Sequence, residues 1–303
     1  MTTTPTIHLG VPTQAGPLTV FPVWTDAPLP EKALRARLPK GATIDELPDG
    51  SEVEYLTVHN PTPKTFLLPG GSIFDGGLQH RALVHSVVVD AHSDLTIDVR
   101  CVEQGRWGGR KTQQLHRRRA PLAVRGALRG VSADRVADDP DLVFADQTDV
   151  WSRVHRYEAS AGLSATSSLV EMTDRLEPAG TDALGELRPL LGQRGVLIGI
   201  GGHPAVLEIF DHPRTLADQW DAILTSVVAD ARLAPARSTS GARARTFVNR
   251  VSRRQLAGRA RAGAAVAASA RDDLAVIDAT VAEAERIVHL AALNARHQLV
   301  GAG

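Results

Sequence analysis

The sequence predicts an α+β fold: an antiparallel β-sandwich or barrel-like sheet with packed helices. Between residues 52 and 103, short apolar segments follow one another, separated by turn-forming residues. From residue 146 onward, several segments carry apolar residues at helical spacing. Short strands joined by turns favour a sandwich or a barrel-like sheet, and the later helices can form the layer that covers it.

The first fifty residues are rich in proline and turn-forming residues and are interpreted as an entry segment. Residues 1–15 are expected to be a flexible N-terminus, followed by a single α+β domain over residues 16–300. Within the entry segment, the apolar run Leu18–Trp24 is predicted as a strand and Glu31–Leu38 as a helix.

The next four predicted strands are Glu52–Val58, Thr65–Leu68, Leu83–Val89 and Thr96–Glu103. The last of them has the clearest pattern. Its alternation puts Ile97, Val99 and Cys101 on one face of the strand, and the same two-residue period places Glu103 with this apolar set. The sequence therefore predicts a carboxylate that points inward at the end of a strand.

Helices dominate the next part of the chain. Apolar residues at helical spacing predict a helical insertion near residues 146–177, with helices over Asp146–Tyr157 and Thr166–Leu176. A longer helix is predicted from Thr215, whose hydroxyl can cap it, and a basic helix near Ala244–Leu256.

Two hairpins are predicted in the second half of the chain. Val196–Ile200 and Ala205–Phe210 flank a glycine pair, which is typical of a hairpin turn. Leu274–Leu293 is ambiguous, because its Ala and Glu residues favour a helix while its apolar runs fit two strands about Glu283–Glu285. The hairpin is preferred.

Composition says little about partners. The chain has 34 Lys and Arg against 34 Asp and Glu, a formal net charge of zero. The single cysteine, Cys101, excludes an intramolecular disulfide and a cysteine-based zinc site, and it indicates a reducing compartment. No run of about 18 apolar residues and no leader pattern is visible. We therefore expect a cytoplasmic protein with no membrane partner.

Two segments concentrate positive charge. Arg100–Gly130 holds eight arginines and one lysine against the single acid Glu103, and Arg232–Arg261 holds nine arginines and no acid. Such segments bind phosphate backbones in some proteins, and in others they are solvated faces that pair with acids elsewhere in the fold. Nucleic-acid binding is therefore kept as an alternative.

A glycine-rich loop is the first candidate ligand site. The pairs Gly70-Gly71 and Gly76-Gly77 precede Gln79-His80-Arg81. Glycine allows positive φ and close approach to a ligand. The segment predicts either a loop that holds an anionic or polar ligand with its N–H groups, Gln79 and Arg81, or a plain hairpin loop. It is not a P-loop, because no Gly-Lys-Ser/Thr follows.

Glu103 is the candidate catalytic residue. An inward carboxylate needs a cation, and Arg81 and Arg106 are the expected partners. The group is either a structural ion pair, or a site where Glu103 acts as a general base or ligand acceptor and Trp107 stacks on a planar ring. Cys101 is expected in the core.

Ser164 and Thr166 are further candidate ligand residues, since hydroxyls at a helix N-terminus suit anions; a plain helix cap is the alternative. The histidines and the acid of the third and fourth strands, His80, His85, His92 and Asp90, fit no standard metal-ligand spacing. No metal is predicted, and the cofactor is unknown.

Several motifs along the chain belong together: the two glycine pairs, Gln79-His80-Arg81, Ser86–Val89, Cys101–Trp107, Gln147, Val150-Trp151, Ser164–Thr166, Gln193 with Gly195, and Val288–Leu290. Together they resemble a bacterial family, the ADP-ribosylglycohydrolase and rhodanese/phosphatase-associated protein domain. They cover most of the chain from about residue 16. The resemblance implies a single domain and, through associated genes, a link to ADP-ribose, NAD or phosphorylated metabolites, but no defined reaction.

The sequence thus predicts binding of a nucleotide-like or phosphorylated small molecule and leaves its processing open. Arginine forks suit phosphate, and a carboxylate beside an aromatic ring suits a ribosyl-base unit. One alternative is a non-enzymatic structural or protein-interaction domain. Another is nucleic-acid binding through the arginine-rich surface. Enzyme activity and oligomeric state stay open.

Overall fold

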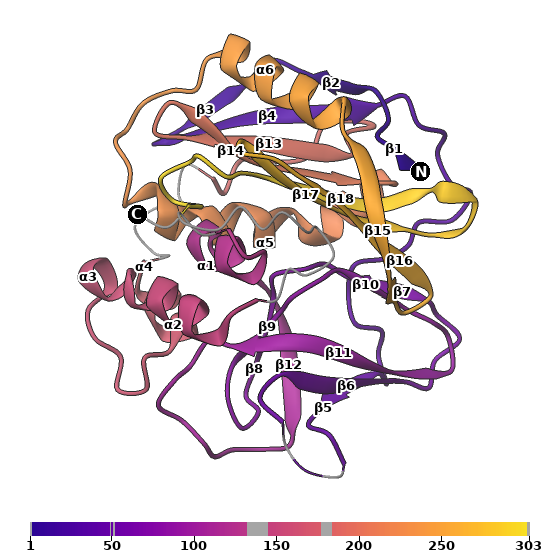
Figure 1. The fold of residues 1–303 in the computed structure, drawn as a ribbon, viewed down its shortest axis with the longest axis vertical. Coiled ribbons are helices and arrows are strands. Elements are labelled where there is room, and N and C mark those ends of the chain that lie inside the picture. Colours follow the sequence, from indigo (N-terminus) through magenta and orange to yellow (C-terminus); the bar gives the residue numbers. More distant parts are fainter. Residues whose placement is uncertain (1, 49, 51, 132–144, 177–183, 302–303) are drawn as a thin grey trace.

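A closed barrel and a large curved sheet make up the molecule, with helices packed beside them (Figure 1). This computed structural model describes residues 2–48, 50, 52–131, 145–176 and 184–301. Every strand ladder in these ranges is antiparallel. The predicted α+β class with a barrel-like sheet agrees with this architecture, although strands predominate.

The large sheet joins both ends of the chain. Its order is β1 (Thr2–Thr3), β15 (Gln255–Ala262), β16 (Ala265–Arg271), β17 (Ala275–Val281), β18 (Ile287–Asn294), β14 (His203–Phe210), β13 (Gly195–Ile200), β4 (Leu18–Thr25) and β2 (Ile7–Leu9), with β3 (Thr13–Ala15) also on β4. Residues 1–15, expected to be flexible, thus supply three short strands.

The barrel is built from the middle of the first half of the chain. Its strands, in order, are β11 (Ser93–Cys101), β6 (Tyr55–Asn60), β5 (Thr43–Asp45), β12 (Thr112–Arg119), β8 (Ser72–Asp75) and β9 (Arg81–Leu83). A two-stranded ladder of β7 (Phe66–Leu68) and β10 (Val87–Val89) lies beside it. Ile97 and Val99 of β11 point into the barrel core, as the alternation predicted.

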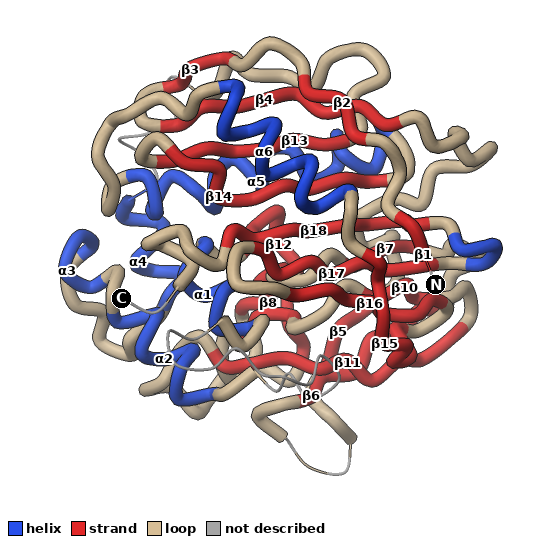
Figure 2. Tube along the Cα trace, turned by 45° about the horizontal axis from the view of Figure 1, so that its top comes forward, coloured by secondary structure: helices blue, strands red, loops and turns tan. Residues whose placement is uncertain are grey.

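Two helices sandwich the large sheet. The helices of the fold are α1 (Leu122–Leu128), α2 (Gln147–His155), α3 (Glu158–Ala161), α4 (Leu169–Leu176), α5 (Pro213–Ala231), α6 (Gly241–Ser252) and the short 3-10 turn η2 (Glu283–Glu285). Val196 and Ile198 of β13 pack in one core with α5, while Leu197 between them packs in another core with α6. Figure 2 shows α6 lying across strands β4, β13 and β14.

The strand at 18–24 and the hairpins at 196–210 and 274–293 are confirmed. The helix predicted from Thr215 is also present, but its predicted cap is wrong: α5 begins at Pro213 and is capped by His212, while the hydroxyl of Thr215 donates to the carbonyl of Leu34. The helix predicted over Glu31–Leu38 is wrong, since these residues form no helix. Arg35 instead forms an isolated β-bridge with Phe66, and its guanidinium binds the carboxylate of Asp218 on α5. These contacts with distant residues hold the segment in a non-helical conformation.

Two other predictions are correct only in part. Leu83–Val89 is not one strand, because the chain leaves β9 at Leu83 and joins β7 only from Val87. The basic helix predicted over Ala244–Leu256 ends at Ser252, and from Gln255 the chain becomes strand β15. Pairing with β16 in a hairpin and with the distant β1 stabilises that strand, and helix propensity does not contain these pairings.

Candidate functional site

Glu103 lies just after β11 at the centre of a polar cluster. Its side chain is 2% exposed. Oε2 accepts hydrogen bonds from Nε of Arg106 (2.9 Å) and from the backbone N–H of His80 (3.1 Å). Oε1 accepts from the hydroxyl of Thr166 at 2.8 Å. Of the two predicted cation partners, the structure therefore brings Arg106 to Glu103.

These contacts fix the charge states in the cluster. Burial alone would raise the pKa of Glu103, but the hydrogen bonds from Arg106 and Thr166 and the nearby His80 lower it below its ordinary value. Burial lowers the pKa of His80, whose Nδ1 lies 3.0 Å from the hydroxyl of Ser168. At neutral pH the cluster holds an ionised carboxylate and an uncharged imidazole.

The same cluster joins three loops. Nη1 of Arg106 donates to the carbonyl of Gly77 (2.8 Å), and the N–H of Gly105 donates to the carbonyl of Thr166 (2.9 Å). A Cβ at Gly105 would lie 3.0 Å from the Cα of Thr166, so glycine allows this approach. Both carboxylate oxygens of Glu103 accept hydrogen bonds within the cluster. The cluster therefore connects the three loops and does not offer a free carboxylate oxygen to a ligand.

The other predicted site residues lie around this junction. Ser164 accepts from the N–H of Ser168 (3.0 Å) and thus closes the turn before α4. Trp107 is 64% exposed on the loop that follows Arg106. Gly76 has φ of +79°, and the N–H of Gly77 donates to Gln113 of β12. These residues share one end of the barrel.

Arg81 and Gln79 point into the barrel instead. Arg81 is fully buried, donates to Oε1 of Gln79 (2.7 Å) and lies 4.0 Å from the carboxylate of Glu46. Gln113 bridges the same carboxylate and the carbonyl of Gln79, each at 3.1 Å. Nε and Nη2 of Arg81 have no hydrogen-bond partner among the described residues. Arg81 is therefore part of a polar barrel interior and not a partner of Glu103.

A second buried carboxylate, Glu208 on β14, was not singled out from the sequence. Oε2 accepts from Nη1 of Arg119 (3.1 Å) and lies 2.7 Å from Nε2 of His289, and Oε1 accepts from Arg125. Nδ1 of His289 lies 2.7 Å from the hydroxyl of Ser86. Glu208 stands among apolar residues, and a lone charge within an apolar strand was the available signal.

Ser86, His289 and Glu208 contact one another in the order of a hydrolase triad, but their surroundings are unsuitable for catalysis. Glu208 is 0% exposed and already faces two arginines. Burial alone would raise its pKa, but the charges of Arg119 and Arg125 hold the pKa well below its ordinary value. Burial lowers the pKa of His289, which weakens it as a base. We interpret this cluster as the structural junction between barrel, α1 and sheet.

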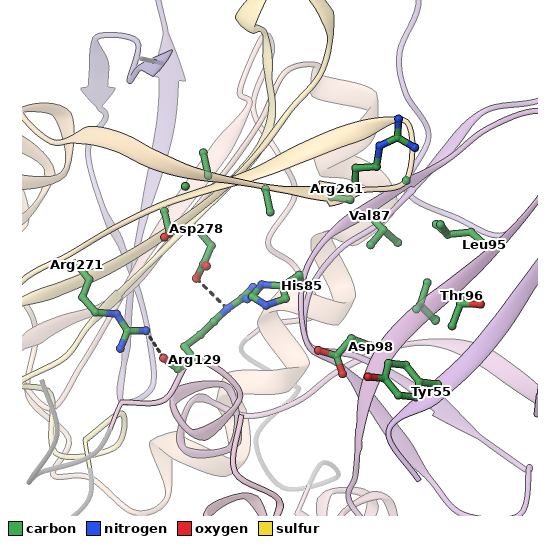
Figure 3. A pocket seen from close by; sticks show the side chains of 17 residues that line it. Tyr55, His85, Val87, Leu95, Thr96, Asp98, Arg129, Arg261, Arg271 and Asp278 are labelled. Atoms are coloured by element: carbon green, nitrogen blue, oxygen red, sulfur yellow. Dashed lines mark hydrogen bonds and ion pairs between the residues drawn. The ribbon is translucent and has the colours of Figure 1, made fainter. Parts of the chain in front are cut away.

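A cavity of about 440 Å³ separates the barrel from the β15–β17 part of the sheet. Figure 3 shows Arg129, Arg271 and Asp278 at one end and Val87, Leu95 and Thr96 at the other, with His85 between them. The sheet wall consists of small residues, Ala262, Gly263, Ala267, Ala268 and Ser269. Larger side chains there would fill the space.

The basic end of the cavity is pre-positioned. Nε of Arg129 pairs with Asp278 at 2.8 Å, and Nη1 donates to Nδ1 of His85 at 2.5 Å. Arg271 donates to the carbonyl of Arg129. Burial and the charge of Arg129 lower the pKa of His85 to about 4. The imidazole is therefore neutral, and because Nδ1 accepts, Nε2 carries the proton.

None of the site residues predicted from the sequence lines this cavity, although His85, Val87 and the central part of β11 lie in the chain between the predicted Arg81 and Glu103. In the part of the chain that is described, no group of three or more His, Cys, Asp or Glu is placed to hold a metal ion. No helix of the described ranges is long and apolar enough to span a membrane.

The protein is thus a β-rich domain composed of a closed barrel and a curved sheet. Its cavity, which is lined by several arginines, lies where the barrel and the sheet meet. The chain belongs to the family described as ARG and Rhodanese-Phosphatase-superfamily-associated Protein domain, whose model matches residues 6–293. No curated protein and no solved structure matches it. The resemblance seen in the sequence is confirmed at the level of this family, whose description names no ligand.

Proposed function

We propose that this protein binds a small phosphorylated, nucleotide-like molecule in the cavity between barrel and sheet. The observation that supports this proposal is the arrangement of side chains along the cavity. Guanidinium groups line one end, and the apolar Val87 and Leu95 line the other, together with Asp98 and Arg261. Arg129 and Arg271 line the basic end, with the neutral His85 beside them. Guanidinium groups match the geometry of phosphate oxygens, and apolar walls accept a base or sugar ring.

Size and placement agree with such a ligand. A volume of about 440 Å³ lies within the range of small-molecule sites, roughly 300–1,000 Å³, and toward its lower end. Arg261 stands at the rim, and its guanidinium has no partner in the described ranges. We place the ligand here and not at Glu103, because both oxygens of Glu103 are already bonded.

The link to ADP-ribose or NAD rests on family resemblance alone and becomes an arm of the test. Thermal unfolding of the purified protein would be followed with AMP, ADP-ribose, NAD, adenosine and inorganic phosphate. A ligand at 100 times its Kd stabilises by about 2.7 kcal/mol, which raises Tm by a few degrees. We expect a shift with a phosphorylated nucleotide and none with adenosine.

A cavity-filling variant locates the site. Ala267→Leu places a larger side chain in the cavity wall, so it should abolish the ligand-induced shift without removing a charge. Ala264→Leu, on the exposed turn beside the same hairpin, is the matched control and should keep the shift. If no ligand shifts Tm, or if both variants behave alike, the proposal fails and a structural or protein-interaction role is favoured. Chromatography of the ligand after incubation tests for processing.

A further inference from the structure

A second basic surface lies far from the barrel, along α6 on the outer face of the sheet (Figure 1). A groove of about 810 Å³ follows the helix, and it shares no residue with the cavity described above. Arg243, Arg250, Arg253 and Arg254 line it, together with Thr246 and Asn249. No acidic side chain is among its lining residues.

The sequence of α6 produces this surface directly. Ala244, Phe247, Val248 and Val251 are buried against the sheet. Their spacing leaves the remaining positions of the helix for polar and basic residues, and Ser240 caps the N-terminus by accepting from the N–H of Arg243 (3.3 Å). Twelve residues at 1.5 Å each give a helix about 18 Å long.

Acids neutralise only part of this charge. Arg250 pairs with Asp272 (2.9 Å) and Asp273 (2.7 Å), and Arg254 also binds Asp272. The guanidinium of Arg253, by contrast, has no ion-pair or hydrogen-bond partner within the described ranges. Arg243 is exposed and donates only to a backbone carbonyl, that of Gly202, at 2.7 Å. Two guanidinium groups at opposite ends of the helix thus carry uncompensated charge.

We infer that this groove binds nucleic acid through its phosphate backbone, without reading its sequence. Arg243, Arg250 and Arg253 succeed one another along the helix, so one strand can meet them in turn. Phe247 is buried and cannot stack on bases, and the exposed ring of His203 is the other aromatic ring among the lining residues. The groove is also more open to solvent than the cavity beside the barrel, which suits a polymer better than a small molecule.

The test is fluorescence anisotropy of a labelled DNA duplex of mixed sequence, titrated with the full chain. Contacts of the two uncompensated guanidinium groups, Arg243 and Arg253, to two phosphates predict that affinity falls by roughly 12-fold between about 50 and 200 mM salt. A second duplex of unrelated sequence should bind equally well. The double variant Arg243→Ala/Arg253→Ala should lower the slope of log K against log salt by about 2, because two phosphate contacts are lost.

Matched variants separate the outcomes. Arg188→Ala/Arg214→Ala removes the same charge from exposed positions outside the groove and should bind like the parent protein. Arg243→Lys/Arg253→Lys, which keeps the charge, should restore most of the affinity. Ala267→Leu should leave DNA binding unchanged, so failure of the small-molecule proposal does not affect this one. Absence of salt-dependent binding, or equal loss in the control double variant, would overturn the inference.

Discussion

Glu103 and Glu208 are both buried carboxylates with every oxygen bonded, yet they differ in what surrounds them. Glu103 ends a strand near the surface, and its cation, Arg106, is 26% exposed. Glu208 lies in the middle of β14, and both of its arginines, Arg119 and Arg125, are buried. Loss of the first carboxylate leaves a cation that water can reach. Loss of the second leaves two that water cannot reach.

This difference teaches that bonding alone does not distinguish a site from a structural junction. The Glu208 cluster has the connectivity of a catalytic triad but lacks access and has excess positive charge. The Glu103 cluster is near solvent but has no free acceptor. Accessible polar groups without full pairing are found instead around His85 and Arg261, where the cavity lies.

The largest effect is expected from Glu208→Gln. It leaves Arg119 and Arg125 with a single neutral acceptor, and breaking a buried ion pair costs about 3–5 kcal/mol. The free energy of unfolding in guanidinium chloride measures this loss. Glu186→Gln, at an exposed position, is the control and should change it by less than about 0.5 kcal/mol. A loss near 1 kcal/mol for Glu208→Gln would show that water or a rearranged side chain compensates the arginines.

A carboxylate without a cation sharpens the comparison through its pH dependence. Asp230 on α5 is fully buried and accepts from Tyr157 (2.6 Å) and from the N–H of Leu122 (2.7 Å). Burial raises its pKa from 3.8 to about 6. Between these values the folded state holds a proton that the unfolded state has released, so the free energy of unfolding falls as pH rises.

Two pKa units correspond to about 3 kcal/mol, an upper limit for this effect. Asp230→Asn removes the titration, so the variant should gain stability relative to the parent between pH 4 and 6.5. Glu208 has the opposite sign, since its depressed pKa stabilises the fold at neutral pH and this stabilisation disappears in acid. If the free energy of unfolding changes with pH in the same way for the parent and for Asp230→Asn across this range, the raised pKa of Asp230 is refuted.

Glu103→Gln should cost less, about 1–3 kcal/mol, because Arg106 can turn toward solvent. Thr166→Val removes a single hydroxyl donor to the same carboxylate and should cost about 1 kcal/mol. Urea unfolding of both variants checks the ranking. A cost for Glu103→Gln equal to that of Glu208→Gln would remove the contrast between the two clusters.

The smallest effect is expected from Trp107→Ala. The ring is mostly exposed, so its removal should change the free energy of unfolding by no more than about 0.5 kcal/mol. Thermal unfolding measures this directly. A larger loss would mean that Trp107 packs on the Glu103 loops and that this end of the barrel is more rigid than its exposure indicates.

Local patterns predicted the elements whose stability is mostly local. The alternation of Thr96–Glu103 and the glycine turn after Ile200 each specify their own structure. Strands β15 and β16 are rich in Ala, Gly and Arg, residues with little strand preference, and they form because β17 offers an edge to β16, which in turn pairs with β15. No single-sequence pattern contains that edge.

The same limit applies to the clusters. Arg106 lies three residues after Glu103, so chain proximity was enough to predict their pair. Arg119 lies 89 residues from Glu208, and His289 lies 81 residues away on the other side. The cavity could not be predicted from its small wall residues either. An alanine in the sequence indicates empty space only when the side chains around it in the fold are known.

The large sheet also has a consequence for synthesis of the chain. Strand β4 pairs with β13, with Val23 opposite Gly195, a separation of 172 residues. At ordinary translation rates, β4 leaves the ribosome roughly 9 to 34 s before its partner. The barrel strands, all between residues 43 and 119, can close during that interval. During that interval one edge of the apolar β4 stays without its partner β13, so this edge of the nascent chain needs protection from wrong pairing.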